Sequence, residues 1–372
     1  MTTVDLGHHG DSEVQPGLVD FAVNVAVPEP PAWLRRELES ALDGAARYPD
    51  VAPAVDALAR LHGCPPSSVL VTNGAAEAFT LIARARRWRR PLVVHPQFTE
   101  PESALQANGH VVTRLILKQG EGFQSDAFTL DPERVPSDAD LVIVGNPTNP
   151  TSRLHPRASI LALVQPGRLV VVDEAFMDVA QGGYDSVLGD AVRGEGLLVI
   201  RSLTKTFGLA GIRAGYLVGT ADVIAECARA QPHWSVNSLA VAAVVACSGP
   251  KGQQHTRAVH QDMSLRLSHL VARLTEAGLD VVSQPAGPFV LVHHPHAALL
   301  RGGLRRRGFA VRRGDTFPGL GPRWLRIAAR EPAMTDALLA AMVQELAVIS
   351  QSTAPLPTLG DRRLPEGETW PC

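Results

Sequence analysis

Three short apolar runs recur in the middle of the chain at equal spacing. They begin at residues 141, 169 and 197, so that successive starts lie 28 residues apart. This is the spacing expected of parallel strands that are joined by helical crossovers. The runs therefore predict an α/β fold built on a mostly parallel sheet.

Each run is followed at once by polar residues. The first leads into the Asn-Pro segment 145–151, the second into Asp173 and Glu174, and the third into the segment that ends at Lys205. Ligands in open parallel sheets sit at the carboxyl ends of the strands. We therefore expect these three segments to converge on one site.

Further strands are predicted at 69–71, 91–95 and 215–219, the last following Lys205 so closely that an antiparallel orientation is suggested. The turn Asn73-Gly74-Ala75-Ala76 precedes an apolar helix over 79–85, and a helix that opens in this way presents free backbone N–H groups to an anion. We expect a large domain of three layers, α/β/α, over 38–263.

The pattern changes near residue 264. A helix is predicted over 265–277 and short strands over 280–283 and 289–293, which indicates a smaller α+β domain. We assign segments 1–37 and 264–350 to this small domain. The remaining segment, 351–372, is rich in Gly and Pro and is expected to be a disordered tail.

Charge and composition exclude several function classes. The 372 residues include 35 basic and 37 acidic side chains, a balance that argues against a nucleic-acid or membrane-surface binder. Five arginines crowd the segment 84–90, which is interpreted as a solvated helix end. The start of the chain lacks an apolar signal region and the apolar stretch 239–247 is too short to span a bilayer, so a cytoplasmic location is expected.

Metal and redox chemistry have little support. The four cysteines, at 64, 227, 247 and 372, form no Cys-x-x-Cys pair. His293, His294 and His296 lack an acidic or cysteine partner close by in the sequence, so no metal site is predicted. Neither Gly-x-Gly-x-x-Gly nor Gly-x-Ser-x-Gly occurs.

Lysine is scarce, and Lys205 is the one lysine of three that follows a predicted strand. A lysine at a strand end, Asp173 one strand over, an Asn-Pro turn and a glycine-opened helix together fit pyridoxal 5′-phosphate (PLP). Lys205 would carry the cofactor as a Schiff base. Asp173 would keep the pyridine nitrogen protonated, because the ring withdraws electrons only in that form.

The other cofactor contacts follow from the same arrangement. Asn149 would donate to the ring oxygen O3′ and Phe98 would stack on the ring. The phosphate would be held by the backbone N–H groups of Ala75 and Ala76, the hydroxyls of Ser202 and Thr204, and Arg213. Each of these residues alone has an ordinary structural explanation, as a turn former, core residue or surface charge. Only the combination of these residues, in this order along the chain, indicates a PLP site.

The segment from Ser202 to Tyr216 resembles the lysine segment of the class I/II aminotransferase superfamily, whose members have fold type I. Segments 47–50, 146–151 and 173–176 resemble the histidinol-phosphate aminotransferase branch in order and spacing. The resemblance covers about residues 5 to 345. It implies that Tyr48 reaches the cofactor phosphate of a neighbouring subunit, in a homodimer with shared active sites.

Within this branch, details resemble the threonine-phosphate decarboxylases of cobalamin biosynthesis. They are segments 7–11 and 19–24, Phe176 in place of a tyrosine, and the pattern over 311–327. The resemblance implies that Arg326 binds a substrate carboxylate or phosphate, with Arg312, His8 and Asn24 completing the pocket.

The chain departs from the branch at two places. Ala26 and Val27 stand where the branch has Asn-Pro, and Ala75-Ala76 replaces a pair that often includes Asp, Ser or Thr. These changes remove side-chain contacts near the cofactor phosphate and the substrate, and leave the backbone cradle intact.

Three functions remain open at this stage. The first is a PLP enzyme that acts on a phosphorylated amino acid, decarboxylating L-threonine O-3-phosphate to 1-aminopropan-2-yl phosphate. The second is an aminotransferase that acts on histidinol phosphate or an aromatic amino acid. The third is a non-catalytic regulatory protein that retains the fold, against which the retention of Lys205 argues.

Overall fold

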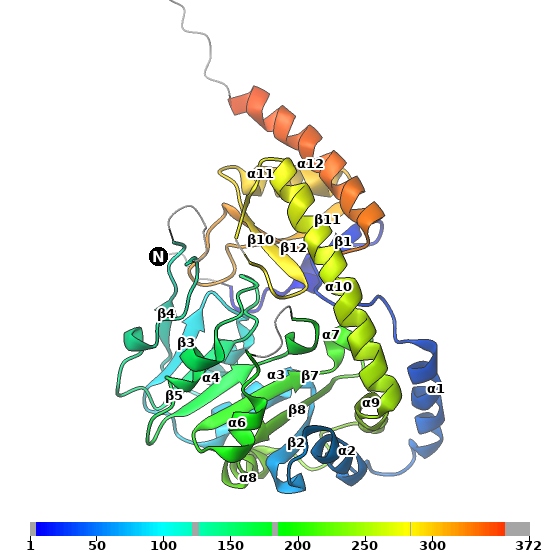
Figure 1. The fold of residues 1–372 in the computed structure, drawn as a ribbon, viewed down its shortest axis with the longest axis vertical. Coiled ribbons are helices and arrows are strands. Elements are labelled where there is room, and N and C mark those ends of the chain that lie inside the picture. The colour runs from blue at the N-terminus through cyan, green and yellow to red at the C-terminus, as the bar shows by residue number, and fades with distance from the viewer. Residues whose placement is uncertain (1–4, 121–125, 181–184, 283, 354–372) are drawn as a thin grey trace, which may run out of the picture.

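A computed structural model of the chain describes residues 5–120, 126–180, 185–282 and 284–353. Two sheets organise it, a seven-stranded sheet and a five-stranded sheet that lies above the first in Figure 1. We propose that they form the centres of the large and the small domain.

The seven-stranded sheet has the order β2-β8-β7-β6-β5-β3-β4. Its strands are β2 (Val69–Asn73), β3 (Pro91–His95), β4 (Thr113–Ile116), β5 (Leu141–Gly145), β6 (Leu169–Asp173), β7 (Leu197–Ser202) and β8 (Ala214–Gly219). All neighbours are parallel except β8, which is antiparallel to both β2 and β7. The mostly parallel sheet and the antiparallel strand after Lys205 are thus confirmed.

Both faces of this sheet are covered, which explains the continuous apolar runs. Alternate residues such as Val170 and Val172 pack with α1, α2, α5, α6 and α9, whereas Leu169 and Val171 pack on the other face with α3, α4 and α8. The bounds of these helices are α1 (Ala32–Ala41), α2 (Ala52–His62), α3 (Gly74–Ala85), α4 (Glu100–Ala107), α5 (Arg157–Leu161), α6 (Leu188–Arg193), α8 (Ala221–Ala230) and α9 (Ser238–Ser248). The predicted three-layer α/β/α arrangement is confirmed.

The five-stranded sheet has the order β1-β11-β12-β10-β9. Its strands are β1 (Val19–Phe21), β9 (Asp280–Val281), β10 (Phe289–His293), β11 (Phe309–Arg313) and β12 (Trp324–Ala328). The N-terminal strand β1 pairs in parallel with β11, and the other pairs are antiparallel. Helices α10 (Pro250–Glu276), α11 (Ala297–Arg306) and α12 (Pro332–Thr353) pack on this sheet and complete its apolar core.

Helix α10 is longer than the sequence predicts. It begins at Pro250 rather than near residue 265, and it runs uninterrupted through the predicted domain boundary at 263/264. Proline is tolerated in the first turn of a helix, so it does not delay the start. Gly252 allows the close approach of α10 to α9, because an added Cβ would lie 1.9 Å from the carbonyl oxygen of Cys247.

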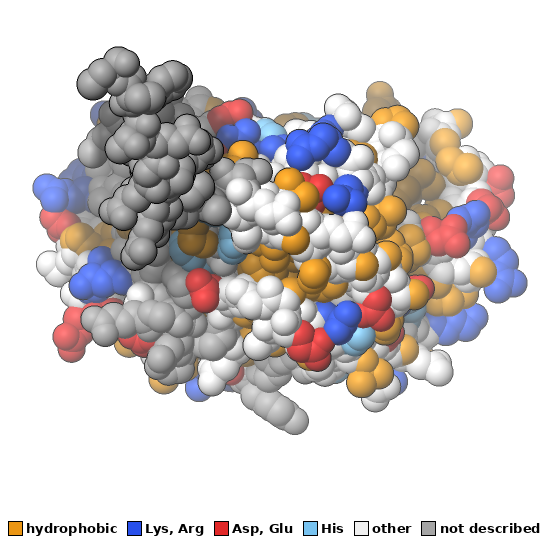
Figure 2. Space-filling view, turned by 90° about the horizontal axis from the view of Figure 1, so that it is seen from above, with side chains coloured by type: hydrophobic (Ala, Val, Ile, Leu, Met, Phe, Trp, Pro, Cys, Tyr) orange, Lys and Arg blue, Asp and Glu red, His pale blue; other side chains and the backbone are white. Residues whose placement is uncertain are grey.

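Helix α12 is the one helix in the described parts of the chain that is long and apolar enough to span a bilayer. Its buried residues Leu338, Leu339 and Met342 belong to the core of the five-stranded sheet, which is the packing of a core helix. Figure 2 looks onto this end, where hydrophobic side chains are interspersed with charged ones. The predicted tail begins within α12, and residues 354–372 lie outside the described part.

Four-residue helix α7 (Thr204–Phe207) follows β7 directly. The short 3-10 helices are η1 (Gly10–Glu13), η2 (Leu42–Gly44), η3 (Pro66–Ser68), η4 (Pro132–Arg134) and η5 (Met177–Val179). Of these, η1 matters for the site, because it lies between the two sheets at the cavity described next.

Candidate active site

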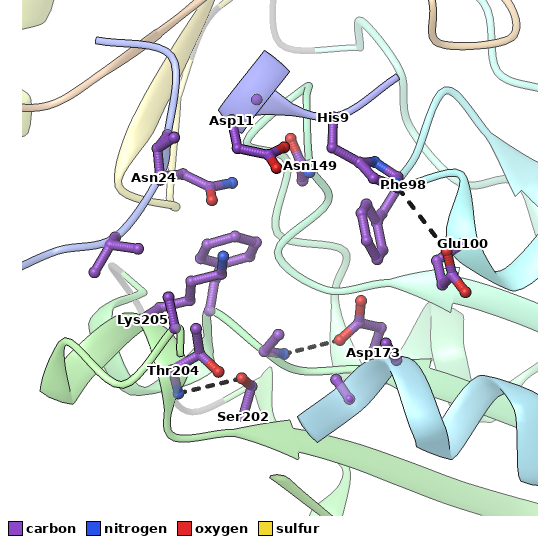
Figure 3. A pocket seen from close by; sticks show the side chains of 18 of the residues that line it. His9, Asp11, Asn24, Phe98, Glu100, Asn149, Asp173, Ser202, Thr204 and Lys205 are labelled. Carbon is purple, nitrogen blue, oxygen red and sulfur yellow. Dashed lines mark hydrogen bonds and ion pairs between the residues drawn. The ribbon is translucent and has the colours of Figure 1, made fainter. Parts of the chain in front are cut away.

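A cavity of about 510 Å³ lies where β5, β6 and β7 end and the small sheet begins. Figure 3 shows side chains from the strand ends of the large sheet and from the N-terminal segment around it, and Arg312 and Arg326 of the small sheet also line it. The predicted residues that line it are Asn24, Ala75, Ala76, Phe98, Asn149, Asp173, Ser202, Thr204, Lys205, Arg213, Arg312 and Arg326. The convergence of the three polar segments at the strand ends is therefore observed.

Lys205 lies in α7, immediately beyond the end of β7. Its Nζ is 5.9 Å from the centre of the Phe176 ring. Burial, together with the positive charges of Arg326 and Arg213, lowers the pKa of Lys205 to about 8 against the opposing effect of Asp173. A lysine with such a pKa is in part a neutral amine near pH 8 and is suited to nucleophilic attack.

Asp173 ends β6 and lies across the cavity from Lys205 (Figure 3). Its Oδ1 accepts a hydrogen bond from the backbone N–H of Ala175 at 3.1 Å. Burial raises the pKa of Asp173 to about 6, with Lys205 acting in the opposite direction. A cationic ring nitrogen beside this carboxylate would stabilise its charged form.

One side of the cavity, formed by the start of α3 and the end of β7, carries several groups that can bind an anion. The first turn of α3, a helix of 12 residues, presents Ala75 and Ala76 to the cavity, and the hydroxyls of Ser202 and Thr204 lie nearby. Helix α3 and β8 approach closely because residue 215 is glycine: an added Cβ there would lie 2.8 Å from the backbone nitrogen of Ala75. Free N–H groups at a helix start, two hydroxyls and the Arg213 guanidinium fit a phosphate group.

Arg326 reaches the cavity from β12. Its Nη1 donates to Oδ1 of Asn149 at 2.6 Å and its Nη2 donates to the carbonyl oxygen of Ala22, while Nε is buried without a hydrogen-bond partner. Burial lowers the pKa of Arg326 to about 9, and the charges of Arg312 and Arg330 add to the effect. The guanidinium therefore lacks a full counter-charge.

Arg312, from β11, is the second buried cation at the cavity. Its Nη2 donates to the carbonyl oxygen of His8 at 2.7 Å, and its guanidinium lies 4.7 Å over the centre of the Phe317 ring. Burial lowers the pKa of Arg312 to about 10. Two desolvated guanidinium groups at one cavity favour a ligand that carries negative charge on that side.

Two predicted site residues lie elsewhere in this chain. The His8 ring does not line the cavity, because its Nε2 pairs with the buried carboxylate of Glu13 at 3.1 Å. Its neighbour His9 lines the cavity instead. Tyr48 is 76% exposed and stacks on Trp234 at 4.3 Å between ring centres, outside the cavity.

His9, Asp11, Glu100 and Phe317 also line the cavity, although they are not among the site residues predicted from the sequence. The His9 ring lies 5.4 Å from the Phe98 ring, and its Nε2 is 3.9 Å from Glu100 Oε2. Glu100 follows two residues after Phe98 at the same strand end, which is a signal that could have identified it. No group of three or more His, Cys, Asp or Glu side chains suited to a metal occurs among the described residues.

The fold and the site together define a PLP enzyme of fold type I. The aminotransferase class I and II family matches residues 16–346, so the chain belongs to this family and PLP is its cofactor. The family and the cofactor expected from the sequence are thus confirmed.

Two curated proteins and one solved structure illustrate what this chain is similar to. A histidinol-phosphate aminotransferase of Mycobacterium tuberculosis is 45% identical over 326 residues, which cover 87% of this chain and 86% of that protein. The threonine-phosphate decarboxylase of Salmonella typhimurium is 32% identical, with 87% of this chain and 90% of that protein covered. The crystal structure of a histidinol-phosphate aminotransferase from Sinorhizobium meliloti in complex with PLP superposes with a TM-score of 0.76 and 20% sequence identity. The match covers 88% of this chain and 90% of that chain.

Proposed function

We propose that this protein decarboxylates L-threonine O-3-phosphate to 1-aminopropan-2-yl phosphate, a reaction of cobalamin biosynthesis. The observation that carries the proposal is the pair of buried guanidinium groups, Arg312 and Arg326, at a cavity of about 510 Å³. A small substrate with a phosphate group supplies the negative charge that these two guanidinium groups would bind. The similarity to a threonine-phosphate decarboxylase at 32% identity supports the same substrate class.

The chain's residues have separate tasks in this reaction. Bound PLP supplies an electron sink at the substrate amine, and Asp173 stabilises the positive charge on its ring nitrogen. The arginines would hold the phosphate and so fix the orientation in which the substrate carboxylate faces the cofactor. The bond between Cα and the carboxylate carbon breaks, CO₂ leaves, and Lys205 delivers one proton to Cα.

An aminotransferase acting on histidinol phosphate or an aromatic amino acid is the second candidate. It is favoured by the 45% identity to a protein named as a histidinol-phosphate aminotransferase. In that reaction Arg326 would hold the carboxylate of an aromatic amino acid or the phosphate of histidinol phosphate, which has no carboxylate, and Lys205 would move the proton of Cα instead. The two functions differ in the bond to Cα that breaks, the bond to the carboxylate carbon or the bond to hydrogen, and both use the same lysine and aspartate. A purely regulatory protein has no use for this lysine.

The deciding experiment incubates PLP-loaded protein with threonine phosphate in the absence of any 2-oxo acid. Mass spectrometry that detects 1-aminopropan-2-yl phosphate over many turnovers supports the decarboxylase. Conversion of the cofactor to its pyridoxamine form, without the amine product, contradicts the decarboxylase and supports the aminotransferase. The Lys205→Ala variant is the control, since it should form neither product.

We further propose that two chains form a homodimer in the cytoplasm and that Tyr48 reaches the partner's cavity. Tyr48 and Trp234 are a stacked pair of exposed rings, and the exposed apolar residues Leu42 and Val51 lie close to Tyr48 in the sequence. Large exposed apolar groups of this kind mark interaction surfaces.

Mixing two inactive variants tests the shared site. Hybrids of Lys205→Ala and Tyr48→Phe chains contain one cavity with both native residues, so mixing should restore activity that neither variant has alone. A monomeric mass in light scattering, or no recovery in verified hybrids, contradicts the proposal.

A further inference from the structure

Glu13 is a buried carboxylate that lies just outside the cavity, at the end of η1. Only 1% of the Glu13 surface is exposed to solvent, and basic side chains surround its carboxylate. Its Oε2 accepts hydrogen bonds from Arg301 of α11, through Nε at 3.1 Å and through Nη2. Its Oε1 lies 3.1 Å from His8 Nε2 and 3.5 Å from the backbone nitrogen of Arg313.

The same carboxylate contacts the substrate-side arginine. Glu13 Oε1 is 3.7 Å from Arg312 Nη1, while Arg312 Nη2 donates to the carbonyl oxygen of His8 at 2.7 Å. Glu13 therefore acts on Arg312 in two ways, directly by charge and indirectly through the residue whose carbonyl holds the guanidinium.

Glu13 also anchors the segment that passes over the cavity. Its backbone carbonyl accepts a hydrogen bond from Arg305 Nη1 at 2.8 Å, which ties the end of η1 to α11. His9, Gly10 and Asp11, just before it, line the cavity. Through its side chain and its backbone carbonyl, Glu13 thus links α11 and β11 to the N-terminal segment.

We propose that Glu13 is a positioning residue that orients the Arg312 guanidinium toward the anionic group of the substrate. The inference rests on the proposed function in one respect, the binding of a substrate anion by Arg312. Arg326 differs from Arg312 here, because its hydrogen bonds go to Asn149 and to a backbone carbonyl. Glu13 is therefore expected to govern one of the two guanidinium groups.

Charge supports this assignment. Glu13 is the strongest of the influences that keep Arg312 protonated against its burial. The pKa of Glu13 itself is lowered, since its bonds to Arg301 and His8 outweigh its own burial. The carboxylate is thus charged, and replacing it by an amide of the same shape removes the charge and turns an acceptor into a donor.

The matched control is Glu345 of α12. It is also buried, and its Oε1 accepts from Arg307 Nε at 2.6 Å, yet it does not line the cavity or contact Arg312. Glu345→Gln removes a comparable buried ion pair from the same end of the molecule. Thermal unfolding should show a loss of stability in both Glu13→Gln and Glu345→Gln.

The test measures the dissociation constant of threonine phosphate from the change it causes in the visible spectrum of PLP-loaded protein. Glu13→Gln should weaken binding about tenfold, the effect of one lost charged hydrogen bond, and Glu345→Gln should leave binding unchanged. The double variant Glu13→Gln/Arg312→Gln should bind no more weakly than Arg312→Gln alone, because Glu13 acts through Arg312.

Three outcomes overturn the inference: unchanged binding in Glu13→Gln, an equal weakening by Glu345→Gln, or a Glu13→Gln effect that persists in the Arg312→Gln background. Failure of the proposed function gives a different result, namely no spectral response of the native protein to threonine phosphate. The same variants are then titrated with histidinol phosphate. Absence of an Arg312→Gln effect on that ligand also overturns the inference.

Discussion

Arg326 donates a hydrogen bond to Asn149 across the cavity, with 2.6 Å between Nη1 and Oδ1. Arg326 belongs to β12 of the small sheet and Asn149 to the loop that follows β5 of the large one. The bond joins a substrate-side residue to a residue assigned to the cofactor. With Arg326 on the substrate and Asn149 on the cofactor, as we propose, this contact would couple substrate binding to cofactor position.

Replacing Arg326 by lysine keeps the positive charge and removes the planar guanidinium group that can donate two parallel hydrogen bonds. We expect KM for the phosphorylated substrate to rise at least about thirtyfold, since truncating one partner of a buried charged pair costs about 2 kcal/mol or more. Steady-state kinetics measures the change. Arg168→Lys is the control, because Arg168 is also buried and donates to three backbone carbonyls away from the cavity. An unaltered KM in Arg326→Lys contradicts substrate binding by Arg326.

The pKa of Lys205 predicts how cofactor attachment depends on pH. Because burial lowers this pKa to about 8, the amine is protonated below pH 8 and becomes nucleophilic as the pH rises through that value. The rate at which cofactor-free protein captures PLP should therefore increase with a midpoint near pH 8, as followed by absorbance.

Arg326→Gln removes a neighbouring positive charge and should move that midpoint upward. Lys205→Ala should not capture PLP at any pH. A midpoint near 10.5, the ordinary lysine value, would show that the amine is not desolvated.

Phe176 faces the lysine, with 5.9 Å between Nζ and the ring centre, and offers no hydrogen-bond donor. Phe176→Tyr adds a phenol that can donate to O3′ of the cofactor and stabilise its deprotonated form. The midpoint of the pH titration of the visible cofactor band should fall. An unchanged midpoint would show that the added hydroxyl does not reach O3′.

Gly215→Ala tests the close packing beneath the phosphate cradle. The new Cβ would lie 2.8 Å from the Ala75 nitrogen and 3.1 Å from the Arg201 carbonyl oxygen, so β8 and the start of α3 must separate. We expect a stability loss of about 1–3 kcal/mol together with weaker PLP binding. Gly211→Ala is the matched control, since its Cβ meets nothing within 4 Å. Equal PLP affinities in the two variants would contradict the role of this contact.

Much of the large sheet could be predicted because its strands are buried on both faces. Such strands form unbroken apolar runs, and the bounds of β3 match the predicted range 91–95. The start of α10 was missed because Pro250 and the polar residues after it resemble a loop. What makes them helical is packing against α9, a long-range contact that local composition does not contain.

Some site residues could likewise be predicted from the sequence and others could not. Lys205 and Asp173 follow strand ends, where the topology alone places them at one edge of the sheet. The N-terminal segment up to Asp11 does not follow a strand of the large sheet, so the topology does not place its side chains. The order of His8 and His9 in the sequence does not tell which ring points into the cavity. That choice depends on Glu13, whose carboxylate draws the His8 ring away from the cavity. A buried acid of this kind has little local sequence signal, since all its partners except His8 lie on β11 and α11.

The uninterrupted helix α10 also makes a mechanical lever. Its 27 residues, at about 1.5 Å per residue, span about 40 Å from the packing with α9 to the core of the small sheet. A tilt of about 3° at one end therefore displaces the other by about 2 Å, enough to make or break a hydrogen bond. A repacking against α9 that tilted α10 would therefore displace the small-sheet end of the helix more than the end beside α9.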